Sequence, residues 1–309
     1  MQPTRVHFWR ADQRIGNFGD ALNIPILKAL GLKVSPAWPQ AVNADRSLNT
    51  PVLFALGSIL DPINLGHYAE PITVWGSGWR GVEIPPVLLA KVSFCAVRGP
   101  DTRAALTRAG VAGADALPQG DPAFLLPWLF PEYRQLRQKH VLRRGADSAC
   151  ARKLLMPHFL ADQVPAASEV GCNARLNSRV RQRHAGFFSI APSVHQLISS
   201  VLRADFLLTS AMHGAIVAQA FGVPWAMWGA RGVDCPPKWQ ELGRFLGISI
   251  EGLDHASEGL EWWQSVGRFA KVPDLTRLVA ALPADKATTK LVLLARMRHV
   301  QRQQEGTTA

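Results

Sequence analysis

The fold of this chain is decided by the stretch Asp205-Phe206-Leu207-Leu208-Thr209-Ser210-Ala211-Met212-His213-Gly214 and the residues that continue it to Trp228. Residues 205–208, apolar after Asp205 and bounded by polar and turn-forming neighbours, predict a buried strand. The small residues from 212 to 220 predict a helix that ends at Gly222, before Pro224. A second apolar run, 224–228, follows at once. The stretch therefore predicts a βαβ unit with parallel strands.

The polar residues of this unit are expected at one edge of the sheet. Ser210, His213 and Gly214 fall between the end of the strand and the start of the helix. Ligands of open α/β sheets bind at that edge, and the backbone N–H groups of a helix start favour anions. A histidine there adds a group that can transfer a proton.

Composition limits the class of protein. The chain has 309 residues, of which 48% are hydrophobic and 18% charged, which predicts one large or two medium folded domains and argues against extended disorder. The net charge of +11 and the pI near 10.1 favour an anionic partner. Nucleic acid, a phosphorylated small molecule and the inner face of a membrane all fit the charge.

Cysteines and apolar runs predict the compartment. Cys95, Cys150, Cys172 and Cys235 are scattered and form no C-x-x-C pair, as expected of reduced thiols in a cytoplasmic protein. The first residues lack the apolar core of a signal peptide, and no apolar run reaches the roughly 18 residues of a membrane helix. We expect a soluble or peripheral protein, with no metal site.

The N-terminal part also reads as alternating strands and helices, with strands at 6–9, 52–56, 72–75 and 92–97 and helices at 21–30 and 100–110. The loop Gly16–Asp20 precedes the first of these helices. It can bring backbone amides against a ligand, with polar contacts from Asn17 and Asp20. The alternative is a plain turn in which Asp20 is the N-cap of the helix.

Residues Gly76–Gly81 match the pattern G-x-G-x-x-G formally, but the sequence around them does not fit a dinucleotide site. Pro85 and Pro86 prevent a helix from opening inside the motif, and the acidic residue expected about 20 positions later is missing. We interpret the stretch as a glycine-rich site loop that presents Ser77, and we reject NAD as a cofactor.

Arg98 comes at a strand end beside the helix start at Pro100. A guanidinium there can hold a phosphate or carboxylate in bidentate fashion. A surface ion pair or a cap on a neighbouring loop is the alternative.

Charge suggests where the domains divide. Residues 134–153 hold seven Lys or Arg against one acid, and we interpret 134–152 as a basic linker between domains 1–133 and 153–309. A last helix over about 275–300 is interrupted by Pro283, and we leave open whether it packs back on the N-terminal domain. Its tail is either a solvated face or a contact with anionic lipid; the basic residues are Lys286, Lys290, Arg296, Arg298 and Arg302.

Several blocks of sequence resemble a known family. Asn17-Phe18-Gly19-Asp20, Val97-Arg98-Gly99-Pro100, Gly120-Asp121-Pro122 and Ala211-Met212-His213-Gly214 occur in the order seen in polysaccharide pyruvyl transferases. The chain is most similar to the exopolysaccharide (succinoglycan-type) ketal-pyruvate transferase branch, which Leu155–Phe159 and Lys238-Trp239 also resemble. Relatives often carry an arginine where this chain has Met212.

The resemblance implies an α/β fold of two Rossmann-like domains in a GT-B-like architecture, with the site in the cleft between them. It implies phosphoenolpyruvate as the donor, with no cofactor, and a sugar hydroxyl pair as the acceptor, in an exopolysaccharide or its lipid-linked repeat unit. The cation missing at Met212 is then supplied by Arg98, by Lys238 or by an arginine of residues 175–183.

Chemistry assigns roles within this resemblance. Ketal formation needs one proton donor and several groups for phosphate and carboxylate. We assign proton transfer to His213, with His158 as a second candidate base; a buried structural histidine is the alternative for both. Donor binding is assigned to Arg98, Lys238, Ser210 and Gly214, and acceptor binding or shaping of the cleft to Asn17, Asp20, Ser77 and His158.

Two other functions stay open from the residues alone. A GT-B glycosyltransferase that uses a nucleotide-sugar shares the same fold, because fold does not determine function. A basic nucleic-acid-binding protein fits the charge, although no aromatic residues are interleaved with the basic runs as stacking platforms. Response to phosphoenolpyruvate, to a nucleotide-sugar or to random DNA separates the three.

Overall fold

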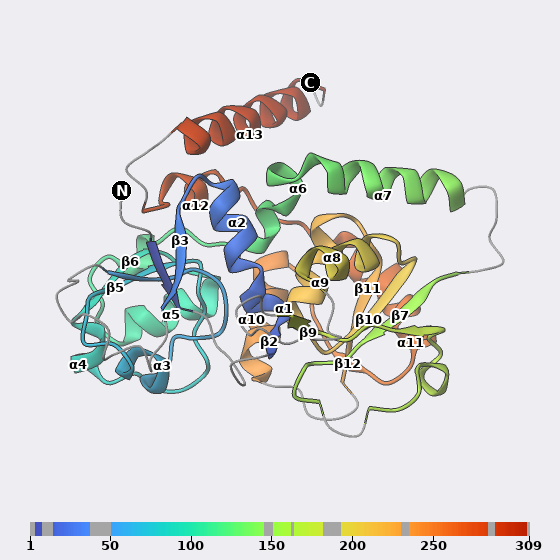
Figure 1. The fold of residues 1–309 in the computed structure, drawn as a ribbon, viewed down its shortest axis with the longest axis horizontal. Helices are drawn as coiled ribbons and strands as arrows, with labels where there is room; N and C mark the ends of the chain where they lie inside the picture. The colour runs from blue at the N-terminus through green and yellow to red at the C-terminus, as the bar shows by residue number, and fades with distance from the viewer. Residues whose placement is uncertain are drawn as a thin grey trace. The chain divides into compact units, whose positions relative to one another are not determined.

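The computed structural model describes residues 4–7, 15–37, 51–144, 151–161, 164–181, 193–229, 235–283 and 288–307. The chain divides into two compact units, each made of separate segments. The first comprises Met1–Phe8, Asn23–Leu129 and Pro273–Ala309, and the second comprises Trp9–Leu22 and Phe130–Val272. Figure 1 labels the helices and strands of both.

The first unit contains a parallel sheet with the strand order β3-β1-β4-β5-β6. Counted along the unit, this is the order 2-1-3-4-5 of one class of doubly wound proteins. The direction in which strands are added reverses between β1 and β4, and ligands of such sheets bind at the carboxyl ends of strands beside the reversal. The strands are β1 (Thr4–His7), β3 (Val34–Ala37), β4 (Val52–Phe54), β5 (Ile72–Trp75) and β6 (Val92–Ala96).

Helices connect these strands, as the alternating pattern predicts. Pro100 opens α5 at its first turn, where the missing N–H of proline costs nothing. The helices are α2 (Asn23–Ala29), α3 (Pro62–Gly66), α4 (Pro86–Leu89), α5 (Pro100–Arg108), α6 (Leu126–Leu129), α12 (Thr276–Ala280) and α13 (Thr288–Thr307), with 3-10 turns η2 (Ala114–Ala116) and η3 (Pro122–Leu125).

The C-terminal segment belongs to this first unit. The indole N–H of the buried Trp75 donates to the carbonyl of Leu278 at 2.7 Å, which ties α12 to the sheet. α13 contacts α6, with Leu293, Leu294 and Met297 buried. The break predicted at Pro283 lies between α12 and α13; Lys286 falls outside the described residues.

The second unit contains a parallel sheet with the strand order β12-β11-β10-β7-β8. Counted along the unit, this is again 2-1-3-4-5, with the reversal between β7 and β10. The strands are β7 (Lys153–Met156), β8 (Ala174–Arg175), β10 (Phe206–Thr209), β11 (Trp225–Trp228) and β12 (Gly252–Leu253). The predicted βαβ unit is confirmed, because β10 and β11 pair in parallel on either side of α9 (Met212–Ala220).

Helices cover both faces of this sheet. A Cβ on Gly214 of α9 would lie 3.7 Å from Leu207, whereas one on Gly259 of α11 (Ala256–Ser265) would lie 2.7 Å from Phe206. Neighbouring residues of a strand point to opposite faces, so α9 and α11 lie on opposite sides of β10. The apolar run 206–208 is buried on both faces for this reason.

The remaining elements of the second unit are α1 (Phe18–Ala21), α7 (Pro131–Arg144), α8 (Val194–Leu202) and α10 (Pro236–Leu246), with 3-10 turns η4 (Ala167–Val170) and η5 (Gly267–Phe269). A separate antiparallel ribbon pairs β2 (Ile15–Asn17) with β9 (Arg179–Arg181). It joins the start of the chain to the second unit.

The basic stretch interpreted as a linker forms most of α7 instead; residues 145–150 lie outside the described part of the chain. One face of α7 packs on α8. On that face Arg137 donates to the carbonyls of Leu202 at 3.3 Å, Ala204 at 2.8 Å and Gly222 at 3.1 Å. The basic composition of the stretch suggested a linker. Composition does not show that one of its arginines bonds three backbone carbonyls of the second unit.

The two units also differ from a division into 1–133 and 153–309. Residues 9–22 belong with the C-terminal sheet and residues 273–309 with the N-terminal one. Pairing between β2 and β9 explains why residues 9–22 belong with the C-terminal sheet. The bond from Trp75 to Leu278 explains why residues 273–309 belong with the N-terminal sheet. Trp9, in the first predicted strand, lies outside the described residues.

Candidate active site

The carboxyl ends of β7 and β10 meet where the strand order of the second sheet reverses. There the N–H of Ser210 donates to the carbonyl of Met156 at 3.2 Å, and the Ser210 hydroxyl accepts from the N–H of His158 at 2.7 Å. The buried Thr209 hydroxyl donates to the Met156 carbonyl at 2.8 Å. These bonds fix the two strand ends to each other at the position where doubly wound sheets bind ligands.

His213 lies in the first turn of α9 and is half-buried. The residue at the helix N-cap is Ala211, whose side chain makes no cap bond. Gly214 allows α9 to approach the sheet closely, because a Cβ there would lie 2.8 Å from the Met156 sulfur and 3.1 Å from the Thr209 hydroxyl. The sequence thus places an imidazole at a strand end, on a helix packed tightly against the sheet.

The segment Asn17–Asp20 lies beside this histidine. A Cβ built on Gly19 would lie only 2.2 Å from Nδ1 of His213, so the imidazole packs directly against the backbone of α1. α1 and α9 are in contact, and Figure 1 shows them next to each other. The structure therefore brings together two blocks separated by almost two hundred residues.

Asn17 is the N-cap of α1, and the alternative in which Asp20 caps the helix is wrong. The Asn17 side-chain oxygen accepts from the N–H of Asp20 at 2.9 Å, and its amide donates to the Asp20 carboxylate. Asp20 is 5% exposed and sits in the first turn, where a negative charge is favoured by the helix dipole. Most of the predicted helix 21–30 is α2 (Asn23–Ala29), and the short α1 precedes it.

The residues just before β9 are hydrogen-bonded to α1 and to the loop after β7. The sequence did not indicate these contacts. The Ser178 hydroxyl donates to the Pro157 carbonyl at 2.6 Å, and the N–H of Phe18 donates to the Ser178 carbonyl at 2.9 Å. Arg179 donates from Nε to the carbonyl of Phe159 at 3.3 Å. The arginine-rich stretch 175–183 contains the end of β8 and all of β9 in its described portion.

His158 and Lys238 belong to the same unit. His158 is half-buried; its Nδ1 accepts from the N–H of Leu160 at 3.4 Å, and its ring centroid is 4.5 Å from that of Phe159. Lys238 lies near the start of α10 and is only 5% exposed. That helix follows Cys235, which has the left-handed φ of 56°.

In the first unit, Arg98 and Ser77 meet each other. The buried Arg98 guanidinium donates to the Ser58 hydroxyl and, at 3.4 Å, to the Trp79 carbonyl, while the Arg98 N–H donates to the Ser77 carbonyl at 3.1 Å. A Cβ on Gly78 would lie 2.1 Å from the guanidinium carbon. Arg98 therefore connects the loops that follow β4, β5 and β6. It is buried among these loops, unlike the exposed arginine of the surface ion pair given as the alternative.

The glycine-rich loop behaves as its prolines predict. The next helix, α4, starts only at Pro86, so no helix opens within Gly76–Gly81. Gly76 has a φ of 97° and would clash with the ring of Pro122 if it carried a side chain. The loop packs around Arg98 and lacks the geometry of a dinucleotide motif.

The reversal in the first sheet is occupied by a buried histidine, which the sequence did not single out. His7 ends β1; its ring stacks on Phe54 with centroids 4.6 Å apart and hydrogen-bonds Tyr68 at 2.7 Å and Asn64 at 3.1 Å. Burial lowers the pKa of His7 to about 4, and its hydrogen bond with Asn64 opposes this only in part. Burial also raises the pKa of Tyr68. His7 is thus a neutral core residue.

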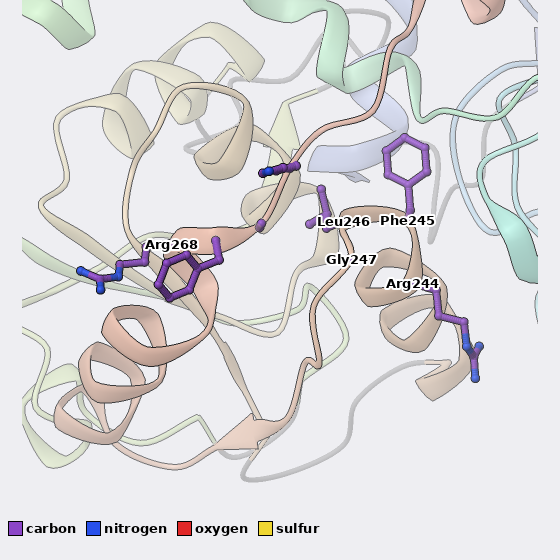
Figure 2. A pocket seen from close by; sticks show the side chains of 8 residues that line it. Arg244, Phe245, Leu246, Gly247 and Arg268 are labelled. Atoms are coloured by element: carbon purple, nitrogen blue, oxygen red, sulfur yellow. The ribbon is translucent and has the colours of Figure 1, made fainter. Parts of the chain in front are cut away.

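A cavity of about 650 Å³ lies elsewhere on the second unit, between the ends of α10 and η5 (Figure 2). α10 and α11 follow strands and run back along the sheet, so their ends lie at its amino edge, opposite His213. Figure 2 shows Arg244 and Arg268 extending in opposite directions. The arginines do not converge on one ligand, and the cavity is separate from the site at the carboxyl edge.

The family model for polysaccharide pyruvyl transferases matches residues 71–227, just over half of the chain. The chain belongs to this family. The matched stretch includes Ser77, Arg98, His158, Ser210 and His213, while Asn17, Asp20 and Lys238 lie outside it.

One curated relative supports the exopolysaccharide branch of the family. The chain is 25% identical over 250 residues to the succinoglycan biosynthesis protein ExoV of Rhizobium meliloti. The match covers 79% of this chain but 66% of ExoV, slightly less than two thirds of that protein.

Solved structures give weaker likenesses. The protein KP1_0663 of Klebsiella pneumoniae matches with a TM-score of 0.45 and 13% identity, over 81% of this chain and 93% of that one. The wall teichoic acid polymerase TagF matches with a TM-score of 0.46 and 10% identity, over 97% and 89%. We draw no conclusion from scores this low.

Within this member of the family, the sheet edge of the second unit collects Asn17, Asp20, His158, Ser210 and His213, and the first unit holds Ser77 with Arg98. Its described helices include none that is both long and apolar enough to cross a bilayer.

Proposed function

We propose that the protein transfers a pyruvyl group from phosphoenolpyruvate to two hydroxyls of a saccharide, forming a pyruvate ketal on an exopolysaccharide or its repeat unit. Family membership and the likeness to ExoV support this proposal. The observation that carries it is the place of His213, half-buried in the first turn of α9 beside Ser210 and the α1 backbone.

The reaction needs one group that moves protons. His213 donates a proton to the methylene carbon of phosphoenolpyruvate, which makes the neighbouring carbon electrophilic. A sugar hydroxyl adds to that carbon and its proton passes to a base. Phosphate then leaves with its bonding electron pair, and a second hydroxyl closes the ketal while its proton passes to the departing phosphate. Proton transfer of this kind contributes about 10²–10⁴-fold to a rate.

The other residues have supporting roles in this proposal. Ser210 and the α9 N-terminus, kept close to the sheet by Gly214, bind the donor together with Lys238. Asn17, Asp20 and His158 contact the acceptor or shape the site around His213. Arg98, bonded to Ser58 and Trp79, orders the loops of the first unit that carry Ser77. None of these steps requires a cofactor.

We also propose that the acceptor is lipid-linked and is modified at the inner face of the cytoplasmic membrane. α13 supports this, because Arg296 and Arg298 are exposed on it and Leu291 is 61% exposed. Basic side chains with an apolar neighbour suit an anionic lipid surface.

Phosphate release from phosphoenolpyruvate, measured with a panel of lipid-linked and soluble oligosaccharides, tests the reaction. The expected result is acceptor-dependent release that His213→Ala lowers about 10²–10⁴-fold. His67→Ala, at an exposed histidine beside α3, is the matched control and is expected to keep full activity. Equal release by wild type and His213→Ala would remove His213 from the chemistry. Absence of release, together with turnover of a nucleotide-sugar, would replace the proposal by glycosyl transfer.

A further inference from the structure

We propose that Arg179 is the oxyanion-binding residue of the site in the second unit, and that it holds the phosphate or carboxylate of the donor. This rests on the proposed function for the identity of the donor. The position, exposure and bonding of the Arg179 side chain support the anion site independently of the donor.

Arg179 is held at the reversal of the second sheet. It follows Ser178, whose hydroxyl donates to the Pro157 carbonyl at 2.6 Å, and its own Nε donates to the Phe159 carbonyl at 3.3 Å. Residues 157–159 lead directly out of β7, and the N–H of His158 donates to the Ser210 hydroxyl. The guanidinium is therefore bonded to the loop that leaves β7, and the same loop is bonded to the end of β10.

The ribbon places Arg179 on the same side as the capping residue of α1. Arg179 pairs with Asn17 across β2 and β9, and residues directly opposite in an antiparallel pair have side chains on one face. α1, which Asn17 caps, packs against His213 through Gly19. Figure 1 shows β2, β9, α1 and α9 gathered in one region, in agreement with the contacts of α1 with β9 and α9.

The guanidinium is available for a ligand. Arg179 is exposed, and once Nε is bonded to Phe159 its two Nη atoms make no hydrogen bond or ion pair to any residue that the structure describes. A guanidinium keeps its charge at all working pH values, and a pair of parallel N–H groups matches two oxygens of a phosphate or carboxylate. By contrast, Arg98 is buried and bonded to Ser58 and Trp79.

The alternative is that Arg179 only bridges β9 to the Phe159 carbonyl. Arg179→Gln separates the two roles, because glutamine keeps an amide donor but removes the charge. Arg175→Gln is the matched control, since Arg175 is also exposed and lies on β8 at the edge of the sheet. A structural bridge alone would change stability without changing anion affinity.

The test measures Kd by calorimetric titration of the full chain with inorganic phosphate and with phosphoenolpyruvate, alongside steady-state phosphate release. Arg179→Gln is expected to raise both Kd values about tenfold to hundredfold, as the loss of a charge-assisted bond implies, and Arg175→Gln to leave them unchanged. His213→Ala is expected to keep binding while losing turnover. Equal Kd values for wild type and Arg179→Gln, or an equal rise in Arg175→Gln, would overturn the proposal.

Two further outcomes separate this inference from the proposed function. If wild type binds phosphate through Arg179 but neither binds nor turns over phosphoenolpyruvate, the anion site stands and pyruvyl transfer falls. If wild type binds neither anion, both fall. Should Arg179→Gln fail to fold, Arg179→Lys decides: a point charge in place of the planar fork is expected to raise both Kd values severalfold, and unchanged values would refute the site.

Discussion

Replacing Gly19 with alanine tests whether the α1 backbone positions His213. The new Cβ would lie 2.2 Å from Nδ1 of His213 and 2.8 Å from Cγ and Cε1 of the same ring. Ordinary contact needs about 3.5–4.0 Å, so the imidazole or α1 must move by roughly 1.3–1.8 Å. Overpacking of this size costs about 1–3 kcal/mol of unfolding free energy.

Gly19→Ala should have the opposite effect on stability when the His213 ring has been removed by a second substitution. Gly19 lies in a helix without a left-handed φ, so nothing in its backbone requires glycine, and alanine is favoured there by about 0.5–1 kcal/mol. In a His213→Ala background, Gly19→Ala is therefore expected to be neutral or stabilising. The difference between the two backgrounds is a coupling energy of about 1–4 kcal/mol.

The assay is urea denaturation of wild type, both single variants and the double variant. Gly66→Ala is the control, because Gly66 lies in α3 and a Cβ there would meet no atom within 4 Å. It should give the same small change in both backgrounds. Additive effects of Gly19→Ala and His213→Ala would refute the packing argument. In the activity assay, a displacement of more than about 1 Å predicts a loss of at least roughly 10²-fold for Gly19→Ala, with little change in the Kd of phosphate.

Three other predictions concern the scaffold. The pKa of His7 is about 4 in the folded chain against 6.5 in the unfolded chain, so the unfolded chain binds a proton first as pH falls, and about 3 kcal/mol of stability is lost between pH 6.5 and 4. His7→Phe should make the urea midpoint less dependent on pH in that window. An unchanged pH dependence in the variant would contradict the prediction. Arg137→Met should cost about 1–3 kcal/mol by leaving the carbonyls of Leu202, Ala204 and Gly222 without their donor, whereas Lys139→Met on the exposed face of α7 should cost little in the same urea titration. Trp75→Phe should speed amide exchange in α12, because the Leu278 carbonyl loses its indole donor; exchange at the wild-type rate would show that other contacts hold the segment.

The sequence predicted those elements whose evidence is local. β10, α9 and β11 were predictable because the apolar run, the small-residue helix and the stop at Gly222 lie within one short stretch. The placing of Ser210 and His213 at a strand end followed from that order alone.

Features that depend on distant partners were not predictable. The basic composition of α7 hides the three carbonyls that Arg137 reaches, and the glycine of Asn17–Asp20 is explained only by the ring of His213. Arg179 could have been singled out only by its pairing with Asn17, since the neighbouring arginines have the same local sequence character. These are long-range contacts, and a single sequence carries no local sign of them.

Two histidines in this chain show why a position in the fold does not make a catalytic residue. His7 lies at a strand end beside the reversal of the first sheet, and His213 comes one helix turn after a strand end beside the reversal of the second. His7 is 2% exposed, bonded to Tyr68 and Asn64, and its pKa is lowered to about 4, so it is neutral at physiological pH and out of reach of a substrate. A proton donor must reach its substrate and be protonated at the working pH. His213 is half-buried as a residue, with the backbone of α1 against Nδ1 and with Nε2 buried, and it follows a strand end at the sheet edge where doubly wound proteins bind ligands. The same sheet topology therefore supplies a packed core in one unit and a candidate proton-transfer site in the other, and the surroundings of each imidazole distinguish the two.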